Sequence, residues 1–120
     1  MKQRNEIVDL SFAFAVRIVR LHKYLTKKKE FTLSNQLLRS GTSIGANVTE
    51  SQDAQSKKDF IAKLSIALKE ARESRYWIEL LIETDYLDKQ SPKVRSLQEE
   101  LESIIKLLTS ILISSKNNLP

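Results

Sequence analysis

The residues of this chain that could do chemistry are mainly cations near its start. Residues 1–39 hold nine lysines and arginines against three acidic residues, a net charge of +6, whereas the rest of the chain sums to −1. Six of these cations lie between positions 17 and 29: Arg17, Arg20, Lys23, Lys27, Lys28 and Lys29. Such a segment attracts phosphate groups, and each phosphate contact releases counterions from a nucleic acid. We therefore take these six residues as a candidate surface for structured RNA or DNA.

Two observations weigh against a more specific interpretation of this segment. A helix face rich in lysine is also a common way for a protein to stay soluble. Tyr24 is the only aromatic residue in this stretch that could stack on a base. Recognition of single-stranded bases is therefore not favoured, because it needs several aromatic platforms.

Catalysis and cofactor binding find little support in the residue types present. The chain has no cysteine, which removes disulfides, thiolate metal sites and cysteine nucleophiles. Its single histidine, His22, cannot supply the two Glu-x-x-His motifs of a di-iron bundle. Neither a nucleophile elbow nor a glycine-rich phosphate loop occurs in the sequence. We expect a protein that is not an enzyme, with no metal, cofactor or small-molecule substrate.

A regular row of polar residues bears on how the protein packs or assembles. It recurs at intervals of 4, 3, 4 and 3 positions and consists of Gln36, Ser40, Ser43, Asn47 and Glu50. A row of this kind is usually solvated. The alternative is that it lies against another helix or subunit, where Asn47 and Glu50 would need partners such as Arg72 or Arg75. A hydrolase site built on the row lacks a base paired with Ser43.

The elements that must carry these residues are helices. Apolar residues recur every three or four positions in four segments, a period that strands do not have. Only two glycines and two prolines are present, too few for the turns of a β-sandwich or barrel. We expect helices at about 5–28, 32–51, 57–85 and 92–115, with Asn5, Ser56 and Ser91 as N-caps and Pro92 at the first helical position. Connections this short predict one domain over residues 1–120, an all-α, antiparallel up-down-up-down four-helix bundle.

Both glycines fall inside the second predicted helix, where each costs about 1 kcal/mol relative to alanine. Gly41 and Gly45 are four positions apart and therefore lie on adjacent turns. This spacing favours a close crossing with another helix, while the alternative is a helix broken at Gly41.

Targeting signals are not evident. The apolar stretch after the N-terminus is too short for a signal-peptide core, and the apolar stretch near the C-terminus is far shorter than the roughly 20 residues that span a bilayer. We expect a cytoplasmic protein without a membrane partner.

One stretch carries a family resemblance. Residues 39–50 read Arg-Ser-Gly-Thr-Ser-Ile-Gly-Ala-Asn-Val-Thr-Glu, and they are followed by Asp-Phe-Ile at 59–61 and Ala-Leu-Lys-Glu-Ala-Arg-Glu-Ser-Arg-Tyr-Trp at 67–77. This pattern resembles a bacterial four-helix bundle family whose members include proteins encoded in intervening sequences of large-subunit ribosomal RNA genes. The family is also similar to the accessory proteins of diversity-generating retroelements, which partner a reverse transcriptase and bind nucleic acid. The resemblance extends from about Phe12 to Leu87.

The resemblance implies a cytoplasmic bundle that assembles as a ring, a homopentamer, with a basic surface. Arg39, Ser43, Asn47 and Glu50 match positions of the family motif, and with Gly41 and Gly45 they are assigned to packing or assembly. The chain departs from the commoner pattern Asn-Ile-Ala-Glu-Gly, since Ser51 stands where the family has glycine. That substitution leaves the turn after the second helix undefined.

Two hypotheses of different classes follow. In the first, the protein is a non-enzymatic oligomeric bundle whose basic first helix binds structured RNA or an RNA-protein assembly. In the second, the ring is a scaffold that docks an acidic protein partner, such as a reverse transcriptase, and has no direct role with nucleic acid.

Overall fold

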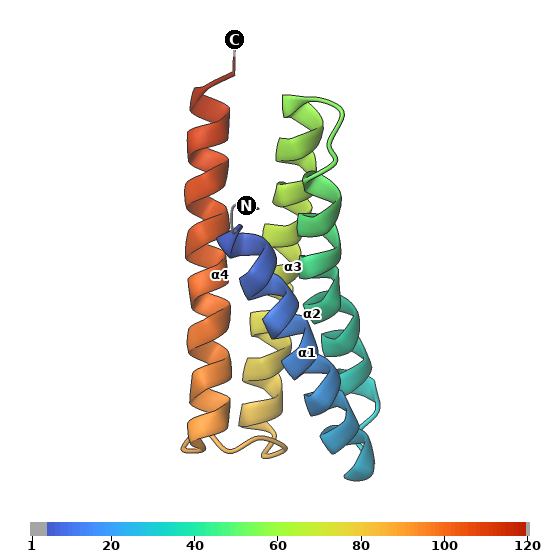
Figure 1. Cartoon of the computed structure of the whole chain (residues 1–120). Helices are drawn as coiled ribbons and strands as arrows, with labels where there is room; N and C mark the ends of the chain where they lie inside the picture. Colours follow the sequence, from blue (N-terminus) through green and yellow to red (C-terminus); the bar gives the residue numbers. More distant parts are fainter. Residues whose placement is uncertain (1–4, 120) are drawn as a thin grey trace.

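The computed structural model describes residues 5–119, which form four α-helices and no strand within that range. The helices are α1 (Glu6–Lys27), α2 (Thr32–Ser51), α3 (Lys57–Glu83) and α4 (Pro92–Asn117). They run alternately up and down, so that each is antiparallel to the next (Figure 1). The all-α, up-down-up-down bundle expected from the sequence is confirmed, and each helix begins and ends within two residues of its expected bounds.

Each helix packs on its neighbours in the sequence, and α1 closes the bundle against α4. The contact between α2 and α3 is the most extensive, and that between α1 and α4 is the least. The core consists of the apolar seams read from the sequence, including the fully buried Phe14, Ile18, Ile44, Leu64, Ile78, Ile104 and Leu108. Burial of such side chains contributes roughly 1.5–3 kcal/mol each, which is the main force holding the four helices together.

The helix starts differ in how they are capped. The Ser56 hydroxyl accepts a hydrogen bond from the Asp59 amide at 3.0 Å, as a capping box requires, although Asp59 in turn accepts from the Gln55 amide. Pro92 occupies the first turn of α4 after Ser91, as expected. Asn5 lies at the N-cap of α1, but its side chain does not cap the helix, because its Nδ2 donates to Gln52 Oε1 at 2.7 Å instead.

The two glycines lie where α1 packs closely on α2, and α2 is one unbroken helix. A Cβ placed on Gly41 would lie 2.9 Å from Ile18 side-chain atoms, and one on Gly45 would lie 3.3 Å from the Ser11 carbonyl oxygen. The close crossing is therefore the alternative that the structure supports. Small residues also lie between α2 and α3, where the buried Ser74 hydroxyl donates to the buried Ser40 hydroxyl at 2.8 Å.

The end of α2 needs no glycine. Ser51 is buried and its hydroxyl donates to the Val48 carbonyl at 2.6 Å, which satisfies one carbonyl of the last turn. Gln52 follows with an ordinary helical backbone conformation. No helix in the described range is long and apolar enough to cross a membrane.

Candidate nucleic-acid interface

The second half of α1 and the two residues after it carry an exposed group of cations that we call the basic face. It comprises Arg20, Lys23, Lys27, Lys28 and Lys29, all of them exposed. Within residues 5–119 none of them forms an ion pair. The Lys28 ammonium lies 4.8 Å from the centre of the Tyr24 ring, a cation–π contact that leaves the charge open to solvent. The basic face therefore keeps its full charge available for a ligand.

Arg17 is placed differently from the other five cations of the sequence prediction. Its Nη1 donates to Glu100 Oε2 at 2.7 Å and to Ser96 Oγ at 3.1 Å, and its Nη2 donates to the Lys93 carbonyl oxygen at 3.0 Å. Its side chain is 29% exposed. Arg17 thus fastens α1 to α4, and its charge is already balanced by a carboxylate.

A cleft lies beside the basic face, between α1, the α3–α4 connection and the start of α4. Its volume is about 520 Å³, which is within the range of ligand sites.

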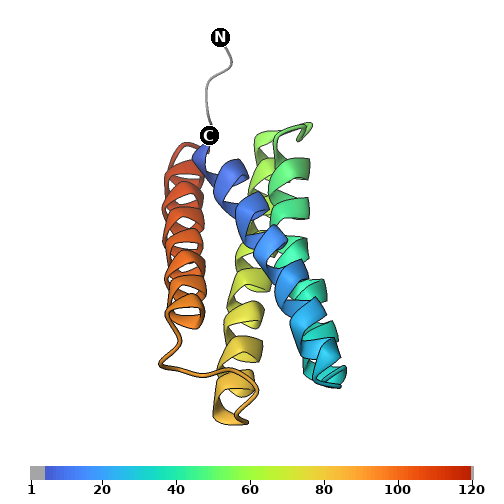
Figure 2. The ribbon, with the colours of Figure 1, turned by 60° about the horizontal axis from the view of Figure 1, so that its bottom comes forward.

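The walls of the cleft come from segments far apart in the sequence. Arg20 and Tyr24 line it from α1, Tyr86 and Asp88 from the α3–α4 connection, and Lys93 from α4. Leu87, Val94 and Leu97, all buried, form its apolar lining. Figure 2 shows the α3–α4 connection and the C-terminal end of α1 at the same end of the bundle. The up-down topology therefore places a second tyrosine in the lining of the cleft that holds Tyr24, which the sequence did not reveal.

The family motif lies on the other side of the bundle and is engaged in holding α2 on α3. Arg39 donates to Glu70 Oε2 at 3.0 Å and also pairs with Glu73. Glu73 in turn accepts a hydrogen bond from the Trp77 indole at 3.0 Å. That bond, and then the Arg39 guanidinium, lower the pKa of the Glu73 carboxyl, although partial burial acts in the opposite direction.

The polar row of α2 mostly bonds within its own helix. Ser43 Oγ donates to the Arg39 carbonyl at 2.7 Å, and Asn47 Nδ2 donates to the Ser43 carbonyl at 2.9 Å. Glu50 is exposed. Of the two alternatives for this row, a solvated face or contacts with Arg72 or Arg75, the second is not found for Asn47 and Glu50, because Asn47 bonds to its own helix and Arg75 pairs with Glu102 at 3.1 Å.

One buried acid was missed by the sequence analysis. Glu30, 7% exposed, accepts hydrogen bonds from the Leu33 amide at 2.9 Å and the Ser34 amide at 2.7 Å, so its carboxylate caps the N-terminus of α2. The preceding Lys29 has a φ of 64°, which turns the chain between the two helices. The signal for this cap was an acidic residue two positions before Thr32, which directly follows a run of three lysines.

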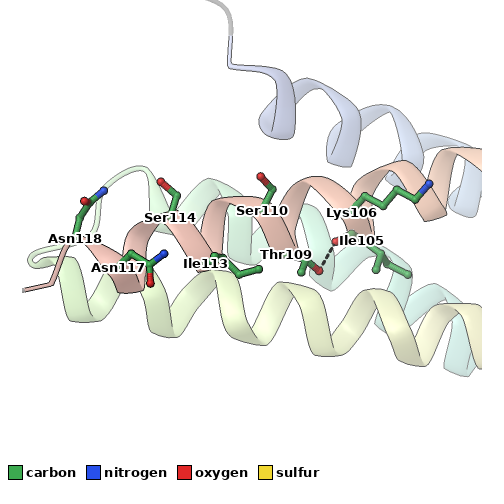
Figure 3. Close-up of a pocket in the computed structure, with 8 residues that line it drawn as sticks. All are labelled: Ile105, Lys106, Thr109, Ser110, Ile113, Ser114, Asn117 and Asn118. Atoms are coloured by element: carbon green, nitrogen blue, oxygen red, sulfur yellow. Dashed lines mark hydrogen bonds between the residues drawn. The ribbon is translucent and has the colours of Figure 1, made fainter.

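A second concave surface runs along α4 and is open and shallow. Figure 3 shows its lining residues spread along the helix from Ile105 to Asn118, with Thr109 and Ile113 between them. Ile113 is 58% exposed there, and Phe12 on α1 is 69% exposed. No group of three or more His, Cys, Asp or Glu residues that could hold a metal ion occurs in the described range.

These features define a class before any comparison is made: an antiparallel four-helix bundle with one basic helix face and no metal-binding cluster among its described residues. Residues 3–110 match the family model described as 23S rRNA-intervening sequence protein, and the chain belongs to that family. The resemblance stated from the motif is thereby confirmed.

A solved structure gives the same result. A crystal structure of a Bacteroides thetaiotaomicron protein from the S23 ribosomal protein family, described as having unknown function, is 53% identical in sequence. The match covers 88% of this chain and 97% of that one, with a TM-score of 0.84. No curated protein matches the chain.

Proposed function

We propose that the protein is a non-enzymatic, oligomeric helical bundle of the cytoplasm that binds nucleic acid, structured RNA or an RNA-protein assembly, through the basic face of α1. The observation that carries this proposal is the set of five exposed cations without ion-pair partners in residues 5–119. The absence of cysteine suits a reducing compartment.

Arg17 has a supporting part in this proposal. Because it is hydrogen-bonded to α4 through three acceptors, it positions the basic face relative to the start of α4. Replacing it would change both charge and packing, so the test of binding leaves it intact.

The test is a salt series with purified, nuclease-treated protein and two probes, an RNA hairpin and a DNA duplex. Arg20, Lys23, Lys27 and Lys28 are changed together to alanine, while Lys29 is kept because of its positive φ. The slope of log K against log salt should become shallower by roughly three units and affinity should fall at least about tenfold, since each lost phosphate contact removes counterion release.

The matched control changes the same number of charges elsewhere. Lys57, Lys58, Lys106 and Lys116 are exposed on α3 and α4 and do not line the cleft. Their change to alanine should alter affinity far less. Equal losses in the two variants would show that only net charge matters and would contradict the assignment to α1. Absence of binding at low salt would reject the proposal and favour the scaffold that docks an acidic protein such as a reverse transcriptase.

The oligomeric part of the proposal is a ring, a homopentamer as the resemblance implies. It is supported by large apolar side chains left exposed on the outer faces of the bundle: Phe12, Val19, Ile66 and Ile113. Exposed apolar surface of this kind marks interfaces when it is contiguous.

A further inference from the structure

We propose that the cleft between α1 and the α3–α4 connection binds one unpaired nucleotide, its base against the tyrosines and its phosphate on the cations. This inference rests on the proposed function and specifies which part of a nucleic acid the protein recognises. Base recognition was not favoured from the sequence because Tyr24 was the only aromatic residue in the basic stretch that could stack on a base. In the fold, Tyr86 lines the same cleft as Tyr24, so two aromatic rings are present.

The lining fits the two halves of a nucleotide. Tyr24 and Tyr86 are 46% and 38% exposed, so a planar ligand can reach the Tyr86 ring and the face of the Tyr24 ring that Lys28 does not cover. Base–aromatic stacking tolerates any base, because every base has a π-face. The buried Leu87, Val94 and Leu97 extend the apolar surface below them.

The charges favour an anion with a hydrogen-bond donor. Arg20 and Lys93 line the cleft and have no ion-pair partner in the described part of the chain, so a phosphate could be held there. Asp88 is the one carboxylate in the lining, and one of its oxygens already accepts from the Gln90 amide at 2.9 Å. Its second oxygen can accept from an exocyclic amine, which favours cytosine over uracil.

The experiment compares two RNA duplexes that differ by one bulged cytidine. The wild-type protein should bind the bulged duplex about tenfold more tightly, from stacking of one base. Tyr86→Ala should remove this preference and leave affinity for the regular duplex and its salt slope unchanged. Tyr76→Ala is the matched control, because Tyr76 is exposed on α3 and does not line the cleft.

A second measurement protects the test against a variant that folds poorly. In the unaltered protein, cytidine monophosphate should shift the NMR ring signals of Tyr24 and Tyr86 but not of Tyr76. Equal affinity for the two duplexes, or a shift of all three tyrosines or of none, would overturn the inference while leaving binding through the basic face intact. Failure to bind either RNA would instead reject the proposed function.

Discussion

Arginine and lysine have separate tasks in this protein. Every ion pair found in residues 5–119 uses an arginine, and Arg17, Arg39 and Arg75 each join two helices. The planar guanidinium can satisfy several acceptors at once, whereas an ammonium is a strongly hydrated point charge. In the sequence Arg17 is indistinguishable from the other cations of the basic segment, because its carboxylate partner lies 83 positions away and no local pattern indicates it.

Glu73 makes the stability of the fold depend on pH. Because its pKa is lowered in the folded state, its contribution to stability is present above the ordinary pKa of 4.5 and is lost as pH falls through the lowered value. Glu73→Gln should therefore reduce the free energy of unfolding at pH 7, by less than about 1 kcal/mol for so accessible a group. The difference from wild type should shrink toward pH 3, as measured by urea unfolding across pH.

The control for this prediction is Glu79→Gln, an exposed glutamate on the same helix. It removes one negative charge without removing a bond to Trp77 or Arg39. A constant difference between Glu73→Gln and wild type from pH 7 to pH 3 would contradict the assigned role.

At the scale of elements, periodicity predicted nearly everything. The four helices, the start of α4 at Pro92 and the glycine crossing all follow from local spacing or residue type. Capping was less predictable, because the Asn5 side chain bonds to Gln52, 47 positions away, and the Glu30 carboxylate caps α2 from outside the usual N-cap position. The spacing of the polar row in α2 left open whether Arg72 or Arg75 would partner it, since a long side chain has several acceptors within reach, and Arg75 in fact pairs with Glu102.

The crossing of α1 and α2 leads to a prediction. Gly41→Ala adds a methyl group 2.9 Å from the buried Ile18 and should destabilise the fold by about 1 kcal/mol or more, because overpacking exceeds the gain in helix propensity. Gly45→Ala, with 3.3 Å to its nearest neighbour, should cost less. Chemical denaturation measures both.

A double-mutant cycle identifies the cause. Ile18→Ala should destabilise the Gly41→Ala protein less than it destabilises wild type, because it removes the clashing atoms. Additive effects of the two changes would show that Ile18 is not what limits the space at Gly41.

At the scale of the whole molecule, the topology places segments that are distant in the sequence around one cleft. The charge difference between the first 39 residues and the rest was visible at once, but the cleft was not. Tyr24 and Tyr86 line one cleft only because α1 and the α3–α4 connection lie at the same end of the bundle (Figure 2). A pattern confined to one helix cannot contain such a site.

Assembly is the prediction that belongs to this scale. The wild-type protein should have a mass several times 13.8 kDa by light scattering at micromolar concentration, because large apolar side chains are exposed. Phe12→Glu should lower that mass by placing a charge in an apolar contact. Thr49→Glu, the same charge at an exposed polar position of α2, should leave it unchanged. A monomeric mass for the wild-type protein would contradict the proposed ring assembly.

An even number of antiparallel helices has a practical consequence. The start of α1 and the end of α4 both point to the end of the bundle opposite the cleft (Figure 1). A fusion partner or surface tether attached near either of these points is directed away from the basic end. The immobilised protein would then present Lys27, Lys28 and the two tyrosines of the cleft to solution.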